Sequence, residues 1–221
     1  LFFDATRIAF SPSIAQNSEQ SPKPENYKSD SLKMLSLWKT YWRLDNAEKH
    51  DSCLDVCHQM ISIGMRIGEN VLDSTLYEKY AKAFGGIGFN LMSLGDYDVA
   101  LKYSLMSYEK LRQRFGPNHI RIAEVLTGIA FNYLERGDYE NAIKNIHKSS
   151  DVVNKLFPEG HYYLANRQYN LALVYKQMGD YEKALDWLDT SFVYRDHDMV
   201  YAKYGSHSDS LKSHPRYKAL L

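Results

Sequence analysis

The tripeptide Gly-Asp-Tyr occurs three times in the chain, at a constant spacing of 42 residues. The three copies begin at Gly95, Gly137 and Gly179. An alanine follows three residues after the tyrosine of each copy, at Ala100, Ala142 and Ala184. A fixed period of this length predicts a stacked-repeat architecture, in which each unit buries its apolar face against the next. Such an array presents a long surface, and this favours the binding of another protein over catalysis.

The composition is that of an ordinary globular protein, with 221 residues of which 44% are hydrophobic and 24% are charged. The 27 basic and 27 acidic residues cancel, and this balance disfavours nucleic-acid binding, which usually rests on a basic excess. No apolar run approaches the roughly eighteen residues of a membrane-spanning helix. The two cysteines do not indicate a disulfide framework, so we expect a reducing, cytoplasmic setting.

The beginning of the chain has a different character. Residues 11 to about 30 are rich in Ser, Pro, Asn, Gln and Lys, a composition that buries too little apolar surface to order itself. We therefore expect an N-terminal arm or linker over residues 1–30. Its more apolar start, Leu1–Phe10, is interpreted as either a docking segment or the remnant of a neighbouring domain. Because the sequence starts at Leu1 without a methionine or a signal-type segment, we expect it to be a piece of a longer protein.

From Ser31 onward apolar residues recur at the three- and four-residue spacings of a helix, as at Leu32, Leu35, Trp38 and Trp42. Because terminal repeats are usually atypical, we expect a degenerate first repeat before three regular ones. The predicted boundaries are 31–73 for the degenerate repeat, 74–115, 116–157 and 158–200 for the regular repeats, and 201–221 for a C-terminal capping segment.

Within each regular repeat the tripeptide is predicted to end one helix and begin the next. The glycine suits the left-handed position after a helix, and the aspartate is placed to cap the second helix. The tyrosine is expected to pack between the two helices, and the later alanine to let them approach closely. At the start of the first regular repeat, Thr75 and Glu78 stand at capping-box spacing and predict the helix start there.

The order of a small residue, a tyrosine, Gly-x-Tyr and an alanine resembles the tetratricopeptide repeat. The small residues are Gly88, Ala130 and Ala172. The usual period of that repeat is about 34 residues, whereas a 42-residue period with the loop Gly116-Pro117-Asn118-His119 resembles the longer subtype of kinesin light chains. The resemblance spans about residues 74–200. It implies an all-α fold: a right-handed superhelical stack of helix-turn-helix repeats with a C-terminal capping helix.

The chain departs from that subtype at several positions. Ile120 and Tyr162 stand where a proline often follows the loop histidine. Of the paired asparagines frequent in kinesin light chains, only Asn170 has a counterpart here. The resemblance therefore extends to the subtype and not to that protein.

Three groups of residues allow a chemical and a structural interpretation. Cys53 and Cys57, near His50 and His58, could be a metal cluster, but the repeat alignment favours core positions for both cysteines. His119 and His161 recur with the 42-residue period, which favours structural capping over catalysis. The glycines of the segment 85–88 allow a close helix approach, a kink, or a groove floor open to a ligand backbone.

In this repeat class the first helix of each pair lines the concave face of the superhelix. Carried over position by position, the resemblance implies a peptide-binding surface of Lys82, Phe89, Met92, Glu124, Thr127, Phe131, Leu134, Asn166, Tyr169, Asn170, Leu173 and Lys176. Phe89, Phe131 and Leu173 share one register, so part of this face is apolar. Asn170 would hold a peptide backbone, and the two lysines would attract acidic side chains.

The resemblance implies a non-catalytic scaffold or adaptor that binds a partner peptide or helix in this groove, with no metal and no cofactor. Self-association is left open as a second mode. The alternative is a regulatory or oligomerising arm of a larger signalling enzyme, such as a kinase or a nucleotide-driven switch. A third hypothesis places Leu1–Phe10 in the groove as an autoinhibitory segment.

Overall fold

The structure is a computed structural model that describes residues 22–158 and 162–193. Residues 1–21 of the predicted arm 1–30, the loop histidine His161 and the capping segment 201–221 lie outside the described residues. The helices are α1 (Tyr27–Asp45), α2 (His50–Ile67), α3 (Ser74–Ser93), α4 (Tyr97–Phe115), α5 (Ile120–Glu135), α6 (Tyr139–Leu156), α7 (Tyr162–Gln177) and α8 (Tyr181–Val193).

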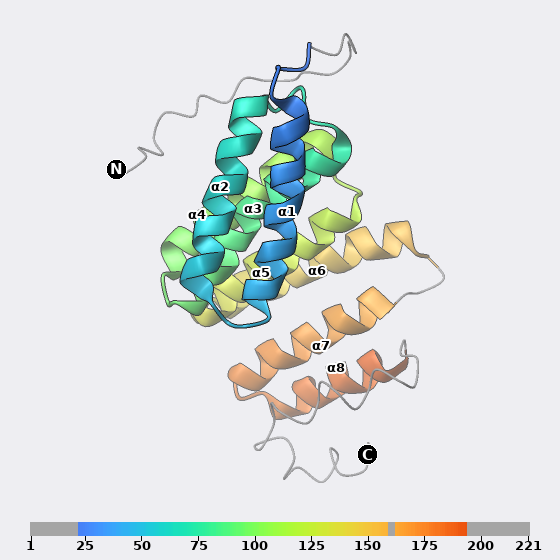
Figure 1. The fold of residues 1–221 in the computed structure, drawn as a ribbon. Helices are drawn as coiled ribbons and strands as arrows, with labels where there is room; N and C mark the ends of the chain where they lie inside the picture. Colours follow the sequence, from blue (N-terminus) through green and yellow to red (C-terminus); the bar gives the residue numbers. More distant parts are fainter. Residues whose placement is uncertain (1–21, 159–161, 194–221) are drawn as a thin grey trace.

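The fold is all-α, as the sequence predicted. Consecutive helices form antiparallel pairs, and each pair packs on the next to give a stack that runs from α1 to α8 (Figure 1). The helix α3 also contacts α1 on one side and α5 on the other, so the first helices of successive pairs lie side by side. The first helix begins at Tyr27, ahead of the predicted start at Ser31. We retain the predicted repeat boundaries as a proposal.

The three tripeptides form the turns that the sequence predicted. Their glycines have positive φ angles, +87° at Gly95, +75° at Gly137 and +81° at Gly179, a conformation that other residues adopt at a steric cost. The aspartates then cap the second helices. Each carboxylate accepts the backbone N–H three residues ahead, at 3.4 Å for Asp96, 3.1 Å for Asp138 and 3.2 Å for Asp180.

The tyrosines of the three copies do not share one environment. Tyr139 packs against the buried cluster around Ala142 and Ile146, as predicted. Tyr181 is 41% exposed, so the predicted packing between helices is wrong for the third copy. The helix α8 is the last one in the described ranges, so no described helix packs on its outer side as α7 packs on α6.

The small residues permit close approach of the paired helices. Ala100, Ala142 and Ala184 are fully buried. A Cβ atom on Gly88 would lie 2.4 Å from Ser104 Oγ and 2.8 Å from the carbonyl oxygen of Ala100. Glycine is therefore required at position 88 by the contact between α3 and α4.

Two capping predictions have different outcomes. His119 caps α5, since its Nδ1 accepts the N–H of Arg121 at 3.3 Å and its ring stacks on Phe115. The predicted capping box at Thr75 is wrong, because Asp73 caps α3 with a carboxylate 2.9 Å from the N–H of Leu76. Aspartate is a stronger cap than threonine, and Asp73 lies two residues before the predicted cap.

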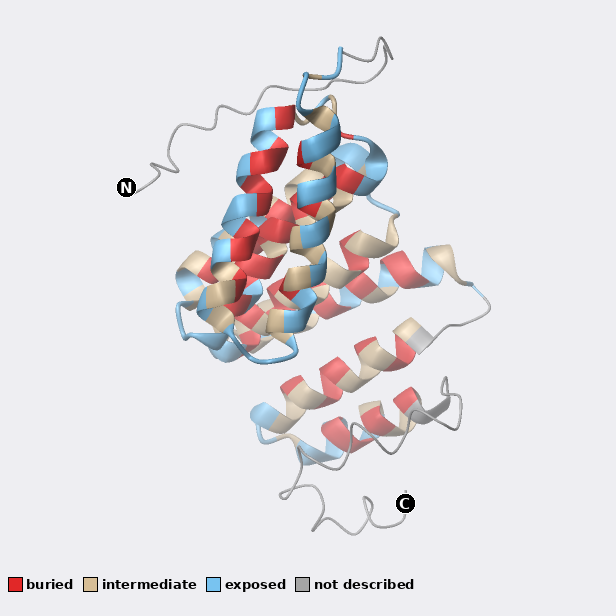
Figure 2. Cartoon of the chain, in the orientation of Figure 1, coloured by how far each residue is buried: buried red, intermediate tan, exposed pale blue. Residues whose placement is uncertain are grey.

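The largest core cluster extends from α1 to the start of α7, and two smaller clusters continue it between α5 and α8 (Figure 2). Cys53 and Cys57 are both buried in the largest cluster and both are free thiols, which agrees with the core interpretation. No helix within the described ranges is both long and apolar enough to cross a membrane.

Candidate peptide-binding groove

A cavity of about 440 Å³ lies between α1, α3 and α5, and α4 forms its floor. We call it the anchor cavity. Its apolar lining consists of Trp38, Tyr41, Trp42, Phe89, Met92, Leu111, Val125 and Phe131. Its polar lining consists of Lys82, Ser104, Ser107, Arg121, Glu124 and Asn132. Most ligand sites have this balance of many apolar groups and a few placed polar ones.

One wall of the anchor cavity is a cluster of three aromatic rings on α1. Trp38 and Tyr41 stack with their ring centroids 5.7 Å apart, and Trp42 meets each of them edge-on at 5.6 Å. Their positions at i, i+3 and i+4 place all three on one side of the helix. Trp42 is 45% exposed and Phe89, opposite on α3, is 47% exposed, so large apolar surfaces face solvent at the cavity mouth.

Three glycines complete the lining, Gly85 and Gly86 on α3 and Gly128 on α5. A Cβ atom on Gly86 would lie 2.9 Å from Cys57 Sγ, so that glycine is required by packing. A Cβ atom on Gly128 would meet nothing within 4 Å. The cavity therefore reaches the backbone of α5 at Gly128.

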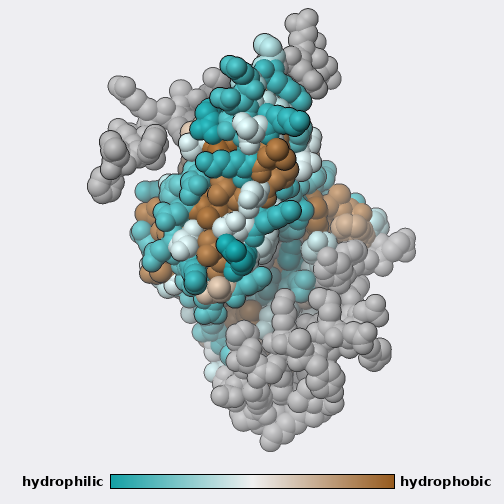
Figure 3. Space-filling view, in the orientation of Figure 1, coloured by the Kyte–Doolittle hydropathy of each residue, from teal (hydrophilic) through white to brown (hydrophobic). Residues whose placement is uncertain are grey.

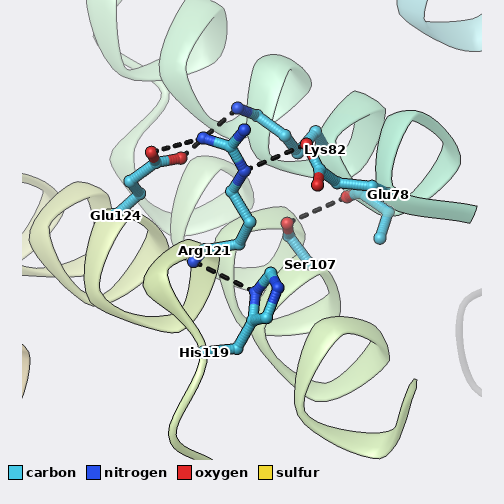
Figure 4. A network of polar contacts seen from close by, with 7 residues as sticks. Glu78, Lys82, Ser107, His119, Arg121 and Glu124 are labelled. Carbon is cyan, nitrogen blue, oxygen red and sulfur yellow. Dashed lines mark hydrogen bonds and ion pairs between the residues drawn. The ribbon is translucent and has the colours of Figure 1, made fainter. Parts of the chain in front are cut away.

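An ion-pair network crosses the α3 and α5 side of the cavity (Figure 4). Arg121 lies between two carboxylates, with Nη1 at 2.6 Å from Glu124 and Nε at 2.9 Å from Glu78. Lys82 Nζ lies 3.3 Å from the other oxygen of Glu124 and 5.4 Å from the ring centroid of Trp38. Burial acts to lower the pKa of Arg121, but Glu124 and Glu78 outweigh it and raise that pKa.

Two asparagines occupy equivalent positions on α3 and α5 with different hydrogen bonding. Asn90 donates to the carbonyl of Gly86 at 2.8 Å, and its Oδ1 lies 2.9 Å from His50 Nδ1. Asn132 donates to the carbonyl of Gly128 at 3.1 Å and lies 3.3 Å from Ser104 Oγ. Its Oδ1 is buried and has no hydrogen-bond partner in the described part of the chain. Asn132 is one of the residues that line the cavity.

A serine to carbonyl hydrogen bond recurs in successive repeats. Ser107 donates to the carbonyl of Ala81 at 2.9 Å, and Ser149 donates to the carbonyl of Ala123 at 2.6 Å. In the second case Arg167 of α7 also donates to the serine, with Nε 2.6 Å from Ser149 Oγ. Arg167 is 5% exposed, and burial lowers its pKa. A buried arginine thus joins the third repeat to the second.

Five of the predicted groove residues line the anchor cavity: Lys82, Phe89, Met92, Glu124 and Phe131. The remaining predicted residues do not line it. Those on α7 are Asn166, Tyr169, Asn170, Leu173 and Lys176. Asn170 is 8% exposed, and Tyr169 packs against the core cluster between α7 and α8. Their predicted role in peptide binding stays a prediction.

Two predicted residues on α5, Thr127 and Leu134, contact other parts of the protein and do not line the anchor cavity. Leu134 is 3% exposed and packs in the core cluster with Leu171 and Val174 of α7. Thr127 donates to the carbonyl of Ala123 and lies 3.2 Å from Ser149 Oγ. The predicted role of Leu134 and Thr127 in peptide binding stays a prediction.

The sequence prediction missed the contribution of α1. Trp38 and Trp42 stood out as one apolar stripe, but the stripe alone does not show whether it packs in a core or lines a groove. The spacing of Asn90 and Asn132, again 42 residues, was a second signal that these amides hold repeated positions. The figures agree with a partly apolar surface in this region, since brown patches lie among polar ones over the α1 and α2 end of the molecule (Figure 3).

The comparisons with known proteins settle the family. The tetratricopeptide repeat profile matches residues 79–143 and 121–192, which together exceed half of the chain. The chain belongs to the tetratricopeptide repeat family. The tetratricopeptide repeat profile does not include α1 and α2, although α1 supplies the aromatic wall of the anchor cavity. Among curated proteins there is no significant match.

Solved structures show which tetratricopeptide repeat fold this is. A putative kinesin light chain protein from Podosopora anserina, with nearly identical TPR-like repeats, matches with a TM-score of 0.58 and 14% identity over 74% of this chain and 75% of that one. BtubC (BKLC) from P. vanneervenii matches with a TM-score of 0.57 and 19% identity. That match covers 71% of this chain and 60% of BtubC. The predicted kinesin-light-chain-like form of the repeat is confirmed at the level of fold.

Proposed function

We propose that this chain is a non-catalytic interaction module that binds a segment of a partner protein in the groove formed by α1, α3, α5 and α7. The observation that supports it is the anchor cavity, whose mouth exposes Trp42 and Phe89. Large aromatic side chains exposed together are a common mark of an interaction surface, since they bury much area at little entropic cost.

The setting we propose is cytoplasmic. Cys53 and Cys57 are free and buried, which suits a reducing compartment. Self-association through the same groove stays open as a second mode of the proposed function. The net charge of zero supports a protein partner over a nucleic acid.

The test starts from peptides selected on the immobilised chain from a random phage-displayed library. Their affinities for the wild type are then compared with those for the Phe89→Ala, Phe131→Ala double variant by calorimetry. We expect at least about a tenfold loss, since aromatic anchors dominate binding energy. The control is Leu105→Ala, which removes a 42% exposed side chain on α4, outside the cavity lining. Equal peptide affinities of the wild type and a folded double variant would contradict the groove as the binding site.

A further inference from the structure

The anchor cavity differs from a general concave groove in having a largely apolar lining whose two cationic side chains are each paired with a carboxylate. Its volume of about 440 Å³ lies within the range of sites for small ligands and single large side chains, roughly 300–1,000 Å³. Three features of its lining decide what chemistry it accepts: the open backbone at Gly128, the buried amide of Asn132 and the paired charges at its edge.

The open backbone at Gly128 marks where a ligand main chain can approach. A methyl group added there would meet no atom within 4 Å, whereas one added at Gly86 would collide with Cys57 and Tyr41. Packing therefore accounts for Gly86 and does not account for Gly128. A close approach of another backbone is one of the ordinary reasons for a glycine at such a place.

The amide of Asn132 needs a donor. Asn132 is 1% exposed. Its Nδ2 group donates to Ser104 and to the carbonyl of Gly128, and its Oδ1 accepts no hydrogen bond from the described residues. The equivalent amide at Asn90 has its Oδ1 beside His50. A buried acceptor is rarely left unpaired, and Asn132 is a lining residue of the cavity, one helical turn after Gly128. A peptide N–H that passes Gly128 would satisfy it.

The charges at the cavity edge satisfy one another. Lys82 and Arg121 both contact Glu124, and Arg121 also contacts Glu78. Lys79 Nζ lies 6.0 Å from the ring of Trp38 but does not line the cavity. A charged ligand group would have to disrupt these pairs, so the lining favours an uncharged occupant.

We propose that the anchor cavity holds one uncharged apolar side chain of a partner peptide, with an N–H of that peptide donating to Asn132 Oδ1. The inference rests on the proposed function and adds the chemistry of the anchor. The aromatic rings of α1 bury the side chain, Gly128 lets the peptide backbone approach, and Asn132 fixes the orientation of that backbone.

The probe is N-acetyl-L-leucinamide, titrated into the full chain while the indole N–H signals of Trp38 and Trp42 are followed by NMR. Trp187 on α8 serves as the internal reference. We expect saturable shifts of both cavity indoles with a Kd on the order of millimolar, as suits so small a ligand. Raising the salt from about 50 to about 500 mM should change that Kd less than about twofold, since the probe itself carries no charge.

Three relatives of the probe test the assigned chemistry on the wild-type chain. N-acetyl-L-aspartamide in its anionic form and N-acetyl-L-lysinamide should each bind at least about fivefold more weakly. The fully N-methylated leucine probe has the same side chain and no N–H, and it should also bind more weakly. Tighter binding of either charged probe, or no shift at Trp38 and Trp42 with the leucine probe, overturns the proposal.

Gly128→Leu fills the cavity from α5 and should abolish the shifts. Lys144→Leu adds the same side chain at an exposed position of α6 and should leave them unchanged. Unchanged binding to a folded Gly128→Leu variant contradicts the proposal. A Phe2→Ser, Phe3→Ser variant tests another occupant. If it shifts both indoles without ligand, the chain's own Leu1–Phe10 occupies the cavity and the partner assignment is wrong.

The two proposals fail in different ways. In one outcome, library peptides lose affinity for the Phe89→Ala, Phe131→Ala variant while the leucine probe changes neither indole chemical shift. This outcome supports the proposed groove function and contradicts the apolar anchor. In the other outcome, the probe binds in the cavity but the groove substitutions do not change peptide affinity. This outcome supports the apolar anchor and contradicts the proposed groove function.

Discussion

Arg66 on α2 and Asp30 on α1 form a two-bond ion pair, with Nε 2.8 Å from Oδ2 and Nη2 2.7 Å from Oδ1. The pair fixes α1, the helix of the aromatic wall, against the second helix of its repeat. The Asp30 carboxylate is mostly buried, whereas the Arg66 side chain is half exposed. The arginine hydrogen bonds hold the pKa of Asp30 below its usual value, although burial acts in the opposite direction.

Asp30→Asn should lower the thermal midpoint at neutral pH by about 2 °C or more, because it removes the negative charge of the ion pair. Solvent around the half-exposed arginine weakens the pair and keeps this loss modest. The depressed pKa means that the pair stabilises the folded state above the unfolded pKa of about 3.9. That stabilisation is lost as the pH falls through the lower folded pKa. Thermal melts of both proteins from pH 7 to pH 2 check this, and a difference that does not shrink at low pH would contradict it.

Gly88→Ala and Gly128→Ala should have opposite effects on stability. The new methyl at position 88 would collide with Ser104 and the Ala100 carbonyl, which should cost about 1–3 kcal/mol. The new methyl at position 128 would meet nothing, so the helix should gain about 0.5–1 kcal/mol from the lower entropy of the unfolded chain. Urea unfolding of the two variants measures both. If both substitutions changed the free energy of unfolding by the same amount, the close contact of α3 and α4 would not constrain position 88.

Ser149→Ala should destabilise the fold more than Ser107→Ala, although the two serines hold equivalent positions. Ser107→Ala loses the bond to the Ala81 carbonyl, at a cost of about 1 kcal/mol. Ser149→Ala also leaves the buried Arg167 Nε without its serine partner, and we expect a cost of about 2–3 kcal/mol. Urea unfolding curves give the comparison directly. Equal losses would mean that Arg167 gains little from the serine.

Cys53 and Cys57 should be nearly unreactive in the folded chain. Burial raises the pKa of both thiols, and the thiolate is the reactive form. With a disulfide reagent at pH 8, both thiols should react in guanidinium. Native protein should show less than about one-tenth of that signal over the same time. Fast labelling of one thiol in the native protein would show that α2 opens locally.

The repeat spacing was enough to predict the turns, the aspartate caps and the close helix pairs, because those features depend on residues near in sequence. The cap of α3 was mispredicted because Asp73 and Thr75 compete for the same role, and the stronger acceptor is two residues earlier. The repeat spacing also could not show that Met92 and Leu134 have different environments, because the two residues occupy the same position in successive repeats. Met92 faces the cavity, whereas Leu134 is covered by Leu171 and Val174 of α7.

The candidate site was only partly predictable for a related reason. Phe89 and Phe131 follow from the repeat, but Trp38, Tyr41 and Trp42 belong to a helix that the repeat pattern does not include. The ion pairs of Arg121 and the unpaired oxygen of Asn132 depend on contacts between different repeats. Such contacts are set by how the helices pack, and a single sequence does not state that packing.

If the proposed function holds, the aromatic wall on α1 places ligand recognition on a different helix from the repeats that form the scaffold. The repeats that define the family hold α3 and α5 in place, while the side of the cavity that α1 builds comes from a helix outside them. Substitutions on that single helix could therefore change which ligands the cavity accepts without disturbing the caps, turns and close contacts of the repeats. Related proteins could diverge in specificity by altering one terminal helix while they keep the same stack.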